Sequence, residues 1–327
     1  MNLSILKKSG IKNFKLKQIR SDASFRKYFR INIRNDNRKL LLVNSPNKTE
    51  NNLGYLNISN ILKKMNLSVP EIINYDISKG SFLIEDFGIN TYTYSLKKGE
   101  NEKKLYNLAT EVLIHINKCS KNLKSRVPIY SSKKLINEAL LFLEWYWPII
   151  HKKKAKKKIL NEYIFIWKKL LKNNLKTNKI LVHRDFHIDN LFFLNNRKKI
   201  KACGLIDFQD SVIGPSTYDL VSLLEDARRD VNEEIKKEMF IKYLKKIRIE
   251  NKKNFLNEYK VLSLNRHLKV IGIFTRLFLR DSKKSYLKHI PRIWNLIEKN
   301  SNLVFLNEIN EWLNKYFPKN KRITPKK

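Results

Sequence analysis

The sequence predicts an α+β fold of two lobes, with a small strand-rich lobe over residues 1–88 and a large, mainly helical lobe over residues 89–327. In the first range, short apolar runs alternate with turn-forming residues, as they do in hairpins. In the second, apolar residues recur at helical spacing over long segments. A strand-like stretch at residues 179–210 interrupts this helical pattern and carries acidic and amide side chains.

The small lobe is expected to contain a strand hairpin, a helix and a further strand. The expected strands cover residues 25–33, 39–43 and 80–86, and the expected helix covers residues 49–65. Residues 34–37, Arg-Asn-Asp-Asn, have the composition of a turn between the first two strands. Another extended piece begins at Val69-Pro70. The segment around residues 86–90 would then connect the two lobes.

The large lobe is expected to consist of helices, because its segments repeat apolar residues three or four positions apart. The expected helices cover residues 102–116, 133–147, 153–171, 218–226, 233–247, 255–278 and 293–316. The chain contains no internal repeat. Its basic end, residues 320–327, is expected to be frayed and solvated.

Three oxygen-bearing side chains in residues 179–210 stand beside apolar runs. Asp185 follows the run at residues 179–182, and Asn190 comes five positions later, directly before the run at residues 191–194. A third apolar run ends at Ile206 and is followed directly by Asp207. We therefore expect Asp185, Asn190 and Asp207 to meet at strand ends over one cleft.

This set of side chains suits phosphoryl transfer, which needs a proton acceptor and divalent cations that neutralise phosphate oxygens. Asp185 would accept the proton of the attacking hydroxyl, and Asn190 and Asp207 are hard oxygen ligands for Mg²⁺. Any one of them alone is more simply a helix cap or a turn residue. Together they match H-R-D-x-x-x-x-N followed by D-F-x, with DFQ in place of DFG. The pattern predicts a kinase active site and a protein-kinase-like fold.

A nucleotide site is expected at the edge of the small lobe. The backbone of Glu85 to Phe87 would hydrogen-bond adenine, with Phe87 and Ile84 as apolar cover, although an ordinary strand end with a glycine turn explains the same residues. The loop before the first expected strand contains no glycine, but Ser21, Ser24 and the guanidinium of Arg26 suit phosphate oxygens. The alternative is that Arg26 lies on a solvated strand face.

Composition limits the class of protein. The chain has 327 residues, 42% of them hydrophobic, which suffices for a substantial core without disulfides. Its two cysteines, Cys119 and Cys203, lack the spacing of a zinc site or a disulfide framework. The amino-terminal residues do not resemble a signal peptide, and no apolar run approaches about twenty residues. We expect a cytoplasmic protein with no membrane insertion.

The formal net charge of +38 on its own suggests a nucleic-acid partner. The lysines are instead spread along the whole chain beside asparagine and isoleucine, which indicates a drift in amino-acid usage. No zinc finger, basic zipper or RNP-type motif accompanies the charge. We expect nucleic acid not to be the partner, and we expect the positive field to attract ATP and anionic substrates.

Several longer motifs resemble the aminoglycoside phosphotransferase-like kinases. They are SDASFRKYFR from Ser21, LIEDFG from Leu83, LEWYW from Leu143, HRDFHIDN from His183, LIDFQDSVIGPSTYDLVSLL from Leu205 and NRHLKVIGIFTRLFLRDSKKSYL from Asn265. Within that family the chain is similar to the bacterial kinases that phosphorylate N-acetylmuramate and N-acetylglucosamine at the anomeric hydroxyl. The resemblance implies ATP and Mg²⁺ as cofactors, Asp185 as base, Asn190 and Asp207 as metal ligands, and His183 and Asp219 as supports of the catalytic loop.

Two departures from the wider family stand out. The second small-lobe strand reads LLVNS at residues 41–45 and has no counterpart of the usual kinase lysine. Either Arg26 or another basic residue handles the phosphates, or nucleotide binding differs. Arg184 stands where aminoglycoside kinases usually carry glycine, which favours the sugar-kinase branch. The resemblance therefore implies a sugar 1-phosphate product, formed in peptidoglycan recycling.

Acceptor contacts are the least defined part of the site. Glu144 and Trp145 suit a pyranose ring, although an aromatic cluster with Tyr146 is more often core. His187 and Asp189 either touch the acceptor or stabilise the loop. Arg276 and Arg280 suit a carboxylate, or they pair on the surface with Asp281 or Glu225.

Other functions stay open at this point. The acceptor is alternatively an aminoglycoside, a choline-like alcohol or another hexosamine. From a different class, the chain would be a nucleotide- or nucleic-acid-binding protein without turnover. A monomer is favoured.

Overall fold

The computed structural model describes residues 3–19, 25–34, 36–120, 123, 127–299 and 303–326. The chain forms two compact units, and neither is continuous in sequence. The first unit contains Met1–Cys119 and His183–Ser211, and the second contains Ser120–Val182 and Val212–Lys327. The predicted boundary at residue 88 separates a nucleotide-binding part from an acceptor-binding part. It concerns function and not the packing of segments, so it stays a prediction.

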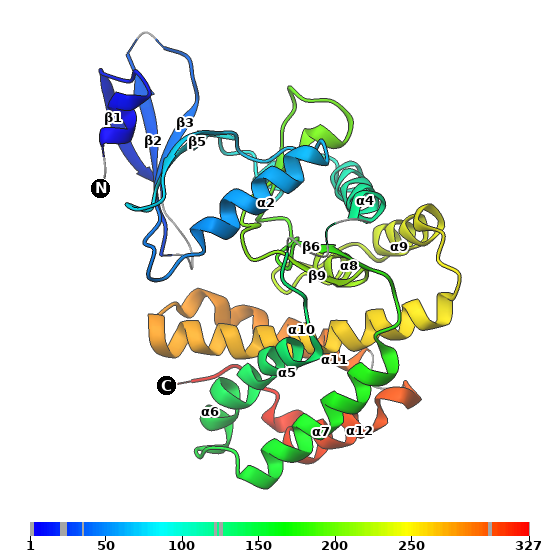
Figure 1. The fold of residues 1–327 in the computed structure, drawn as a ribbon. Coiled ribbons are helices and arrows are strands. Elements are labelled where there is room, and N and C mark those ends of the chain that lie inside the picture. Colours follow the sequence, from blue (N-terminus) through cyan, green and yellow to red (C-terminus); the bar gives the residue numbers. More distant parts are fainter. Residues whose placement is uncertain are drawn as a thin grey trace. The chain divides into compact units, whose positions relative to one another are not determined.

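A five-stranded antiparallel sheet forms the core of the first unit (Figure 1). Its strands are β1 (Phe14–Ile19), β2 (Lys27–Ile33), β3 (Leu40–Asn44), β4 (Ile72–Asp76) and β5 (Ser81–Glu85), in the order β1-β2-β3-β5-β4. The predicted hairpin is confirmed as β2 and β3, with Arg30 opposite Leu41. Strand β1 was not predicted, because its alternation of apolar residues with lysines at the sheet edge is indistinguishable from a solvated basic segment.

The two faces of this sheet are covered differently, since successive side chains of a strand point to opposite faces. On one face, Leu40 and Leu42 pack with Ile5 and Leu6 of helix α1 (Ser4–Lys8). On the other face, Val43 packs with Tyr55 and Leu56 of helix α2. Helix α2 (Asn52–Lys64) begins after Asn51, whose side chain accepts a hydrogen bond from the Gly54 N–H. This second face also carries the hollow described below.

The remainder of the first unit consists of two helices and a small two-stranded sheet. The helices are α3 (Tyr92–Lys97) and α4 (Glu102–Cys119), and the strands are β7 (Leu191–Phe193) and β8 (Cys203–Leu205), joined through the 3₁₀ turn η3 (Lys199–Ala202). The Leu205 N–H donates to the Ser68 carbonyl, so β8 is held by the chain that leads into β4. Helix α3 was not predicted, because its six residues are too few to show a helical repeat.

Helices dominate the second unit. They are α5 (Ser132–Leu141), α6 (Trp147–His151), α7 (Lys157–Asn174), α8 (Tyr218–Leu224), α9 (Glu233–Ile247), α10 (Lys252–Asp281), α11 (Ile290–Glu298) and α12 (Asn307–Tyr316), with 3₁₀ turns η4 (Lys284–His289), η5 (Val304–Leu306) and η6 (Lys319–Lys321). A short antiparallel pair, β6 (Lys179–Val182) and β9 (Val212–Pro215), completes the unit. The prediction for residues 233–247 is confirmed to the residue.

Two of the predicted helices are not single helices. Residues 133–147 divide into α5, a π-helical turn η2 (Phe142–Tyr146) and the start of α6. Residues 293–316 divide into α11, the 3₁₀ turn η5 and α12. Close packing accompanies the π-turn, since a Cβ at Gly272 of α10 would lie 2.4 Å from the carbonyl carbon and oxygen of Leu141. Only glycine permits this approach.

The carboxyl-terminal segment is bound to the second unit, so the prediction of a frayed end is wrong for the described residues up to 326. The buried hydroxyl of Tyr146 donates to the carbonyl oxygens of Lys321, at 3.1 Å, and Ile323, at 2.7 Å. Arg322 forms an ion pair with Glu298 of α11. Because the segment is rich in positive charge, its sequence alone did not predict that it is anchored to α11 and η2. No helix in the described ranges has the length and apolarity needed to cross a membrane.

Candidate active site

The loop that carries Asp185 and Asn190 is closed by its own hydrogen bonds. The His187 N–H donates to the Asp185 carbonyl at 3.0 Å, and the Asn190 N–H donates to the His187 carbonyl at 2.9 Å. The Asn190 side-chain amide also donates to the Asp185 carbonyl, at 3.0 Å. With the amide nitrogen engaged, the Oδ1 of Asn190 is the atom that can bind a further partner.

Asp207 is held next to this loop. The Ile206 N–H, directly before it, donates to the Asn190 carbonyl at 3.2 Å, and the Gln209 side chain donates to Asp207 Oδ1 at 2.9 Å. Loss of hydration, followed by the negative charge of Asp185, raises the pKa of Asp207, although its side chain remains open to solvent. The two carboxylates are thus near enough to repel each other. The structure brings together the three residues that the sequence pattern singled out.

The backbone is strained at two positions of this site. Arg184 has φ of 77° and Asp207 has φ of 62°, a left-handed conformation that costs residues with a Cβ about 1–2 kcal/mol. Such strain concentrates at functional sites, where the surrounding structure holds it in place. The Arg184 guanidinium donates to the Asp210 carbonyl at 3.3 Å. A glycine at position 184, as in aminoglycoside kinases, would adopt this φ without strain.

Asn190 and Asp207 fit a magnesium ion. The described part of the chain contains no cluster of three or more His, Cys, Asp or Glu side chains that could hold a metal. Mg²⁺ does not require one, because it keeps several waters and takes one or two carboxylates from the protein. A divalent cation held by these residues would also offset the negative charge of Asp185, which adds to the loss of hydration in raising the pKa of Asp207.

The three neighbouring residues of the loop have contacts of their own. His183 is buried against Phe186, and burial lowers the pKa of its imidazole to about 4. His187 is buried with its Nε2 3.4 Å from the Asn190 amide nitrogen. Asp189 accepts a hydrogen bond from the hydroxyl of Thr93 in α3. These contacts agree with loop support for His183 and with the loop-stabilising alternative for His187 and Asp189.

Arg26 is buried, with 3% of its surface exposed, so the alternative of a solvated strand face is wrong. Its Nε donates to Ser45 Oγ at 3.1 Å and lies 3.3 Å from Glu50 Oε2. Its guanidinium stands 5.4 Å from the centre of the Tyr55 ring. The positive charge also reaches Asp207, whose raised pKa it opposes. Arg26 is therefore a buried cation whose charge acts on Asp207.

A small hollow lies beside Arg26 on the second face of the sheet, lined by Arg26, Tyr28, Val43, Tyr55, Phe82 and Ile84. Burial raises the pKa of both Tyr28 and Tyr55, so the hydroxyls are neutral at physiological pH. Ile84, predicted as apolar cover for adenine, belongs to this lining. Phe87 does not, because its ring packs against Phe192.

The backbone around Phe87 offers fewer free groups than the sequence suggests. The Glu85 N–H donates to the Glu71 carbonyl and the Asp86 N–H to the Lys39 carbonyl, both at 2.8 Å. The Glu85 carboxylate is in an ion pair with Arg197. Within the described residues no backbone hydrogen bond engages the Phe87 N–H. Ser21 and Ser24, predicted to bind phosphate, lie outside the described residues.

The remaining candidates belong to the second unit. Glu144 is exposed in η2 and Trp145 is half-buried, while Tyr146 is core, packed against Phe142 and Trp294. Burial lowers the pKa of Arg276, and the nearby Glu144 charge opposes that shift. Arg280 forms an ion pair with Asp281 at 2.8 Å, the pairing that the surface alternative describes. Asp219 is buried in the first turn of α8. Their roles in binding or loop support stay predictions.

Glu50 and Gln209 were missed by the sequence analysis. Glu50 pairs with Arg26, and Gln209 bonds Asp207 while its carbonyl accepts a 3.4 Å hydrogen bond from Asn51. One signal was available for Glu50, an acidic residue in the first turn of the predicted helix at residues 49–65, in a strongly basic lobe. Nothing in the sequence pointed to Gln209, because its contacts depend on the turn at Asp207.

The chain matches the model of the phosphotransferase enzyme family (APH) over residues 15–251. The chain belongs to this family. It is therefore a phosphotransferase with an alcohol group as acceptor, as the motifs predicted. The N-acetylmuramate/N-acetylglucosamine kinase of Neisseria meningitidis serogroup B is 30% identical over 305 residues, which cover 88% of this chain and 86% of that protein. The kinase of the same name from Pseudomonas aeruginosa is 31% identical over 288 residues, 85% of this chain and 81% of that protein.

Two solved structures share the fold. Aminoglycoside phosphotransferase APH(2'')-Ib with ADP bound superposes with a TM-score of 0.59 at 20% identity, over 92% of this chain and 99% of that chain. Choline kinase LicA from Streptococcus pneumoniae superposes with a TM-score of 0.61 at 13% identity, over 90% of this chain and 96% of that chain. The predicted α+β class, a strand-rich first part followed by a mainly helical part, is confirmed.

Proposed function

We propose that this phosphotransferase moves the γ-phosphoryl group of ATP to the anomeric hydroxyl of N-acetylmuramate, N-acetylglucosamine or both. The product is the sugar 1-phosphate, and the reaction serves peptidoglycan recycling in the cytoplasm. The proposal is supported by relatives with that activity in their names, at 30% and 31% identity over most of the chain. It is supported in the molecule by the position of Asp185 beside Asn190 and Asp207.

Asp185 is the proton acceptor in this proposal. As the acceptor oxygen bonds to the γ-phosphorus, the bond from that phosphorus to the β,γ-bridging oxygen breaks and ADP leaves. The hydroxyl proton passes to the Asp185 carboxylate, which is only half-buried and so remains reachable. An anomeric hydroxyl is more acidic than an ordinary alcohol, so a carboxylate suffices as general base.

Asn190 Oδ1 and the Asp207 carboxylate would hold Mg²⁺, since they supply hard oxygen donors next to Asp185. When bound, the ion neutralises charge on the phosphate oxygens. The Gln209 amide fixes the Asp207 carboxylate through the bond at Oδ1, so the other oxygen is available to the metal. The left-handed backbone at Asp207 is consistent with this function, because such strained conformations concentrate at functional sites, where the surrounding structure holds them in place.

Arg26 replaces the missing small-lobe lysine in this proposal. In protein kinases a lysine on the third strand contacts phosphates and pairs with a glutamate on the following helix. Here Arg26 pairs with Glu50, which lies two residues before α2. The pairing holds the guanidinium where its charge acts on Asp207. Ser21 and Ser24 complete the phosphate site, and adenine would bind near Ile84 with a hydrogen bond from the Phe87 N–H.

The acceptor identity is tested by a panel of hydroxyl compounds with ATP and Mg²⁺, with the products identified by ³¹P NMR. The panel contains N-acetylmuramate, N-acetylglucosamine, N-acetylgalactosamine, kanamycin and choline, and a parallel set uses GTP. An anomeric phosphate on either of the first two sugars supports the proposal. Phosphate on a ring or exocyclic hydroxyl of another compound would move the assignment to that acceptor. Nucleotide binding without product on any compound would favour a binding module.

Contacts to the acceptor are proposed for Glu144, Trp145, Arg276 and Arg280, with His187 and Asp189 as secondary candidates. Arg276 suits the carboxylate that distinguishes N-acetylmuramate from N-acetylglucosamine, because burial keeps its guanidinium poorly hydrated. Arg276→Gln should therefore lower kcat/KM for N-acetylmuramate and leave that for N-acetylglucosamine nearly unchanged. Equal losses for both sugars would contradict this role. We also propose that the protein acts as a monomer, which sedimentation equilibrium tests.

A further inference from the structure

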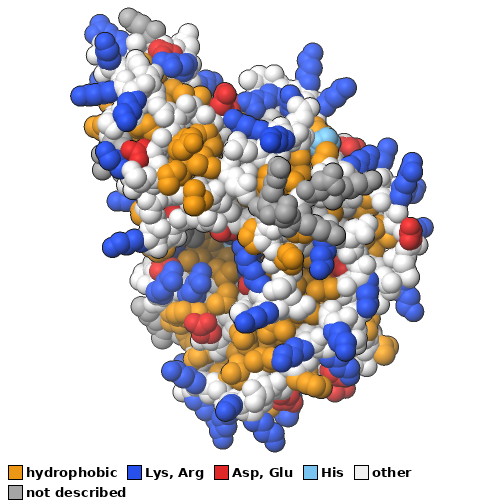
Figure 2. Space-filling view, viewed as in Figure 1, with side chains coloured by type: hydrophobic (Ala, Val, Ile, Leu, Met, Phe, Trp, Pro, Cys, Tyr) orange, Lys and Arg blue, Asp and Glu red, His pale blue; other side chains and the backbone are white. Residues whose placement is uncertain are grey.

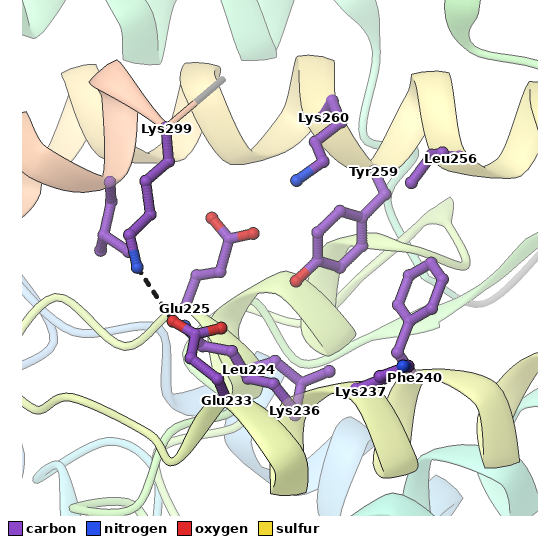
Figure 3. A pocket seen from close by; sticks show the side chains of 11 residues that line it. Leu224, Glu225, Glu233, Lys236, Lys237, Phe240, Leu256, Tyr259, Lys260 and Lys299 are labelled. Carbon is purple, nitrogen blue, oxygen red and sulfur yellow. Dashed lines mark hydrogen bonds and ion pairs between the residues drawn. The ribbon is translucent and has the colours of Figure 1, made fainter. Parts of the chain in front are cut away.

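A cavity of about 250 Å³ lies among the helices of the second unit (Figure 3). Its walls come from the end of α8, from α9 and α10, and from the end of α11. None of its lining residues is among the candidates for catalysis, metal, nucleotide or acceptor binding. The cavity is slightly smaller than typical ligand pockets, which span about 300–1,000 Å³, so an occupant would be no larger than one sugar ring with a substituent.

Charged groups line this cavity unequally, with four lysines against two glutamates. Glu233 is already engaged by two of the lysines, Lys236 at 3.0 Å and Lys299 at 2.9 Å, and the second of these bonds is drawn in Figure 3. Lys237 of α9 and Lys260 of α10 form no ion pair within the residues that the structure describes. Two ammonium groups from different helices are therefore left for another anion.

The inner end of the cavity has a different chemistry. Tyr259 and Glu225 are both buried, with 5% and 8% of their surface exposed, and the Tyr259 hydroxyl points toward Glu225 (Figure 3). Glu225 Oε2 also accepts a hydrogen bond from the hydroxyl of Ser263. Burial, followed by the Glu225 charge, keeps the pKa of Tyr259 far above its usual value. The inner end thus offers a hydroxyl and a carboxylate acceptor, which suit the hydroxyl groups of a ligand.

We propose that this cavity binds a small hydroxylated anion, one sugar ring or smaller, that carries a phosphate or a carboxylate group. The ammonium groups of Lys237 and Lys260 bind the charged group, and the Glu225 carboxylate and the Tyr259 oxygen accept hydrogen bonds from the hydroxyls of the ligand. The apolar side chains of Phe240 and Leu256 cover the ring. A site of this kind would make the enzyme responsive to a charged metabolite through residues that take no part in the transfer reaction.

Lysine and arginine side chains are scattered over the face seen in Figure 2 and attract any anion. The main control must therefore separate binding in the cavity from this general attraction. We would titrate the full chain by calorimetry with glucose 6-phosphate, glucuronate and neutral glucose at 0.15 M salt. The test variant is the double substitution K237Q/K260Q. The matched control is K245Q/K246Q, which removes the same charge from α9 at residues that do not line the cavity. Arg26→Ala reports any binding at the candidate nucleotide site.

Binding of at least one of the two anions, without binding of glucose, is the expected result, and K237Q/K260Q should weaken it at least tenfold, since a hydrogen bond to a charged group is worth about 1.5–3 kcal/mol. The control pair should change affinity less than twofold. Leu256→Trp, at a side chain that is 44% exposed, should fill the cavity and weaken binding without unfolding the protein. Absence of binding by both anions would overturn the proposal, as would equal losses in the two double variants or a loss confined to Arg26→Ala.

Discussion

The side-chain amide of Asn190 donates a hydrogen bond to the backbone carbonyl of Asp185, with 3.0 Å between the two heavy atoms. Because the same loop is closed by two backbone hydrogen bonds, the proposed base and the proposed metal ligand form one rigid piece of chain. The Ile206 N–H then ties Asp207 to that piece through the Asn190 carbonyl. Asn190 is therefore the residue on which the geometry of all three depends.

Replacing Asp185 with Asn should lower kcat by about 10²–10⁴, because the amide cannot accept the hydroxyl proton. The dissociation constant for ATP should change little, since the substitution keeps the size and the backbone of the loop. Steady-state kinetics and a nucleotide titration measure the two effects. Asp36→Asn, at an aspartate on the surface of the same unit, serves as the control. A variant at position 185 with undiminished kcat would remove Asp185 as the base.

Replacing Asn190 with Ala should raise the Mg²⁺ concentration for half-maximal activity by about 10–100-fold, because a metal ligand and the bond to Asp185 are lost together. Activity measured against Mg²⁺ at fixed ATP shows the shift. Asn190→Asp restores an oxygen ligand but cannot donate to the Asp185 carbonyl. It should therefore recover Mg²⁺ affinity in part and kcat hardly at all. If Asn190→Ala has the Mg²⁺ dependence of the wild type, Asn190 is not a ligand.

Arg26 and Glu50 should behave as a coupled pair. Arg26→Ala is expected to raise the KM for ATP at least tenfold. Arg26→Lys should reverse only part of this increase, because an ammonium cannot reproduce the planar guanidinium. Glu50→Gln should weaken ATP binding through the loss of orientation. The double variant should then cost less than the sum of the single losses, with a coupling of about 0.5–3 kcal/mol in nucleotide binding. Additive losses would indicate that the ion pair does not position the arginine.

Arg184→Gly should be more stable than Arg184→Ala by about 1 kcal/mol, the reverse of the usual order, because φ of 77° strains every residue with a Cβ. Both variants lose the hydrogen bond to the Asp210 carbonyl, so the comparison isolates the backbone. Urea unfolding gives the difference in free energy. At the exposed Lys168 in α7 the order should be normal, with Gly less stable than Ala by about 1 kcal/mol. The same order at both positions would disprove the strain.

Asp207→Asn should stabilise the metal-free protein at pH 7.5 while abolishing activity. A carboxyl whose pKa is higher in the folded than in the unfolded chain loses folding stability when it ionises, so the cost exists above its unfolded pKa of about 3.9 and disappears below it. The gain should be no more than about 1 kcal/mol, because solvent still reaches the side chain and screens the repulsion. Unfolding at pH 7.5 and pH 3.5, without Mg²⁺, tests the sign, and Mg²⁺ should stabilise only the wild type. A destabilised variant at pH 7.5 would contradict the repulsion between Asp185 and Asp207.

The sequence predicted the structure correctly where a single segment determines its own conformation. Asp185, Asn190 and Asp207 each stand beside an apolar run, so the sequence alone predicted their convergence. Helix α9 was predicted to the residue because its pattern is regular between Asn232, which caps it, and Arg248, which is left-handed. Strand β1 escaped notice because lysines fill its exposed face. The π-turn at residues 142–146 could not be foreseen, since it follows from the contact of Leu141 with Gly272 in another helix.

Contacts between segments that are far apart in the sequence could not be predicted from it. Glu50 became recognisable only when the sheet placed Arg26 beside it. For Arg26 the sequence left two interpretations of equal weight, and its burial excludes the solvated strand face. Likewise, the Tyr146 hydroxyl and Arg322 anchor a segment whose composition alone predicts a solvated end. In each case nothing in the sequence around one partner marks it as special, and the contact exists only because the fold brings the two residues together.

The first unit is assembled from Met1–Cys119 and His183–Ser211, with a stretch of the other unit between them. A ribosome therefore exposes the sheet and α4 for several seconds before β7 and β8 emerge, at about 5–20 residues per second. During that interval the nascent sheet lacks the segment that carries Asp185 and Asp207. Productive folding of this enzyme must wait for translation to reach Ser211, and slow codons between positions 120 and 182 would lengthen its exposure to chaperones and proteases.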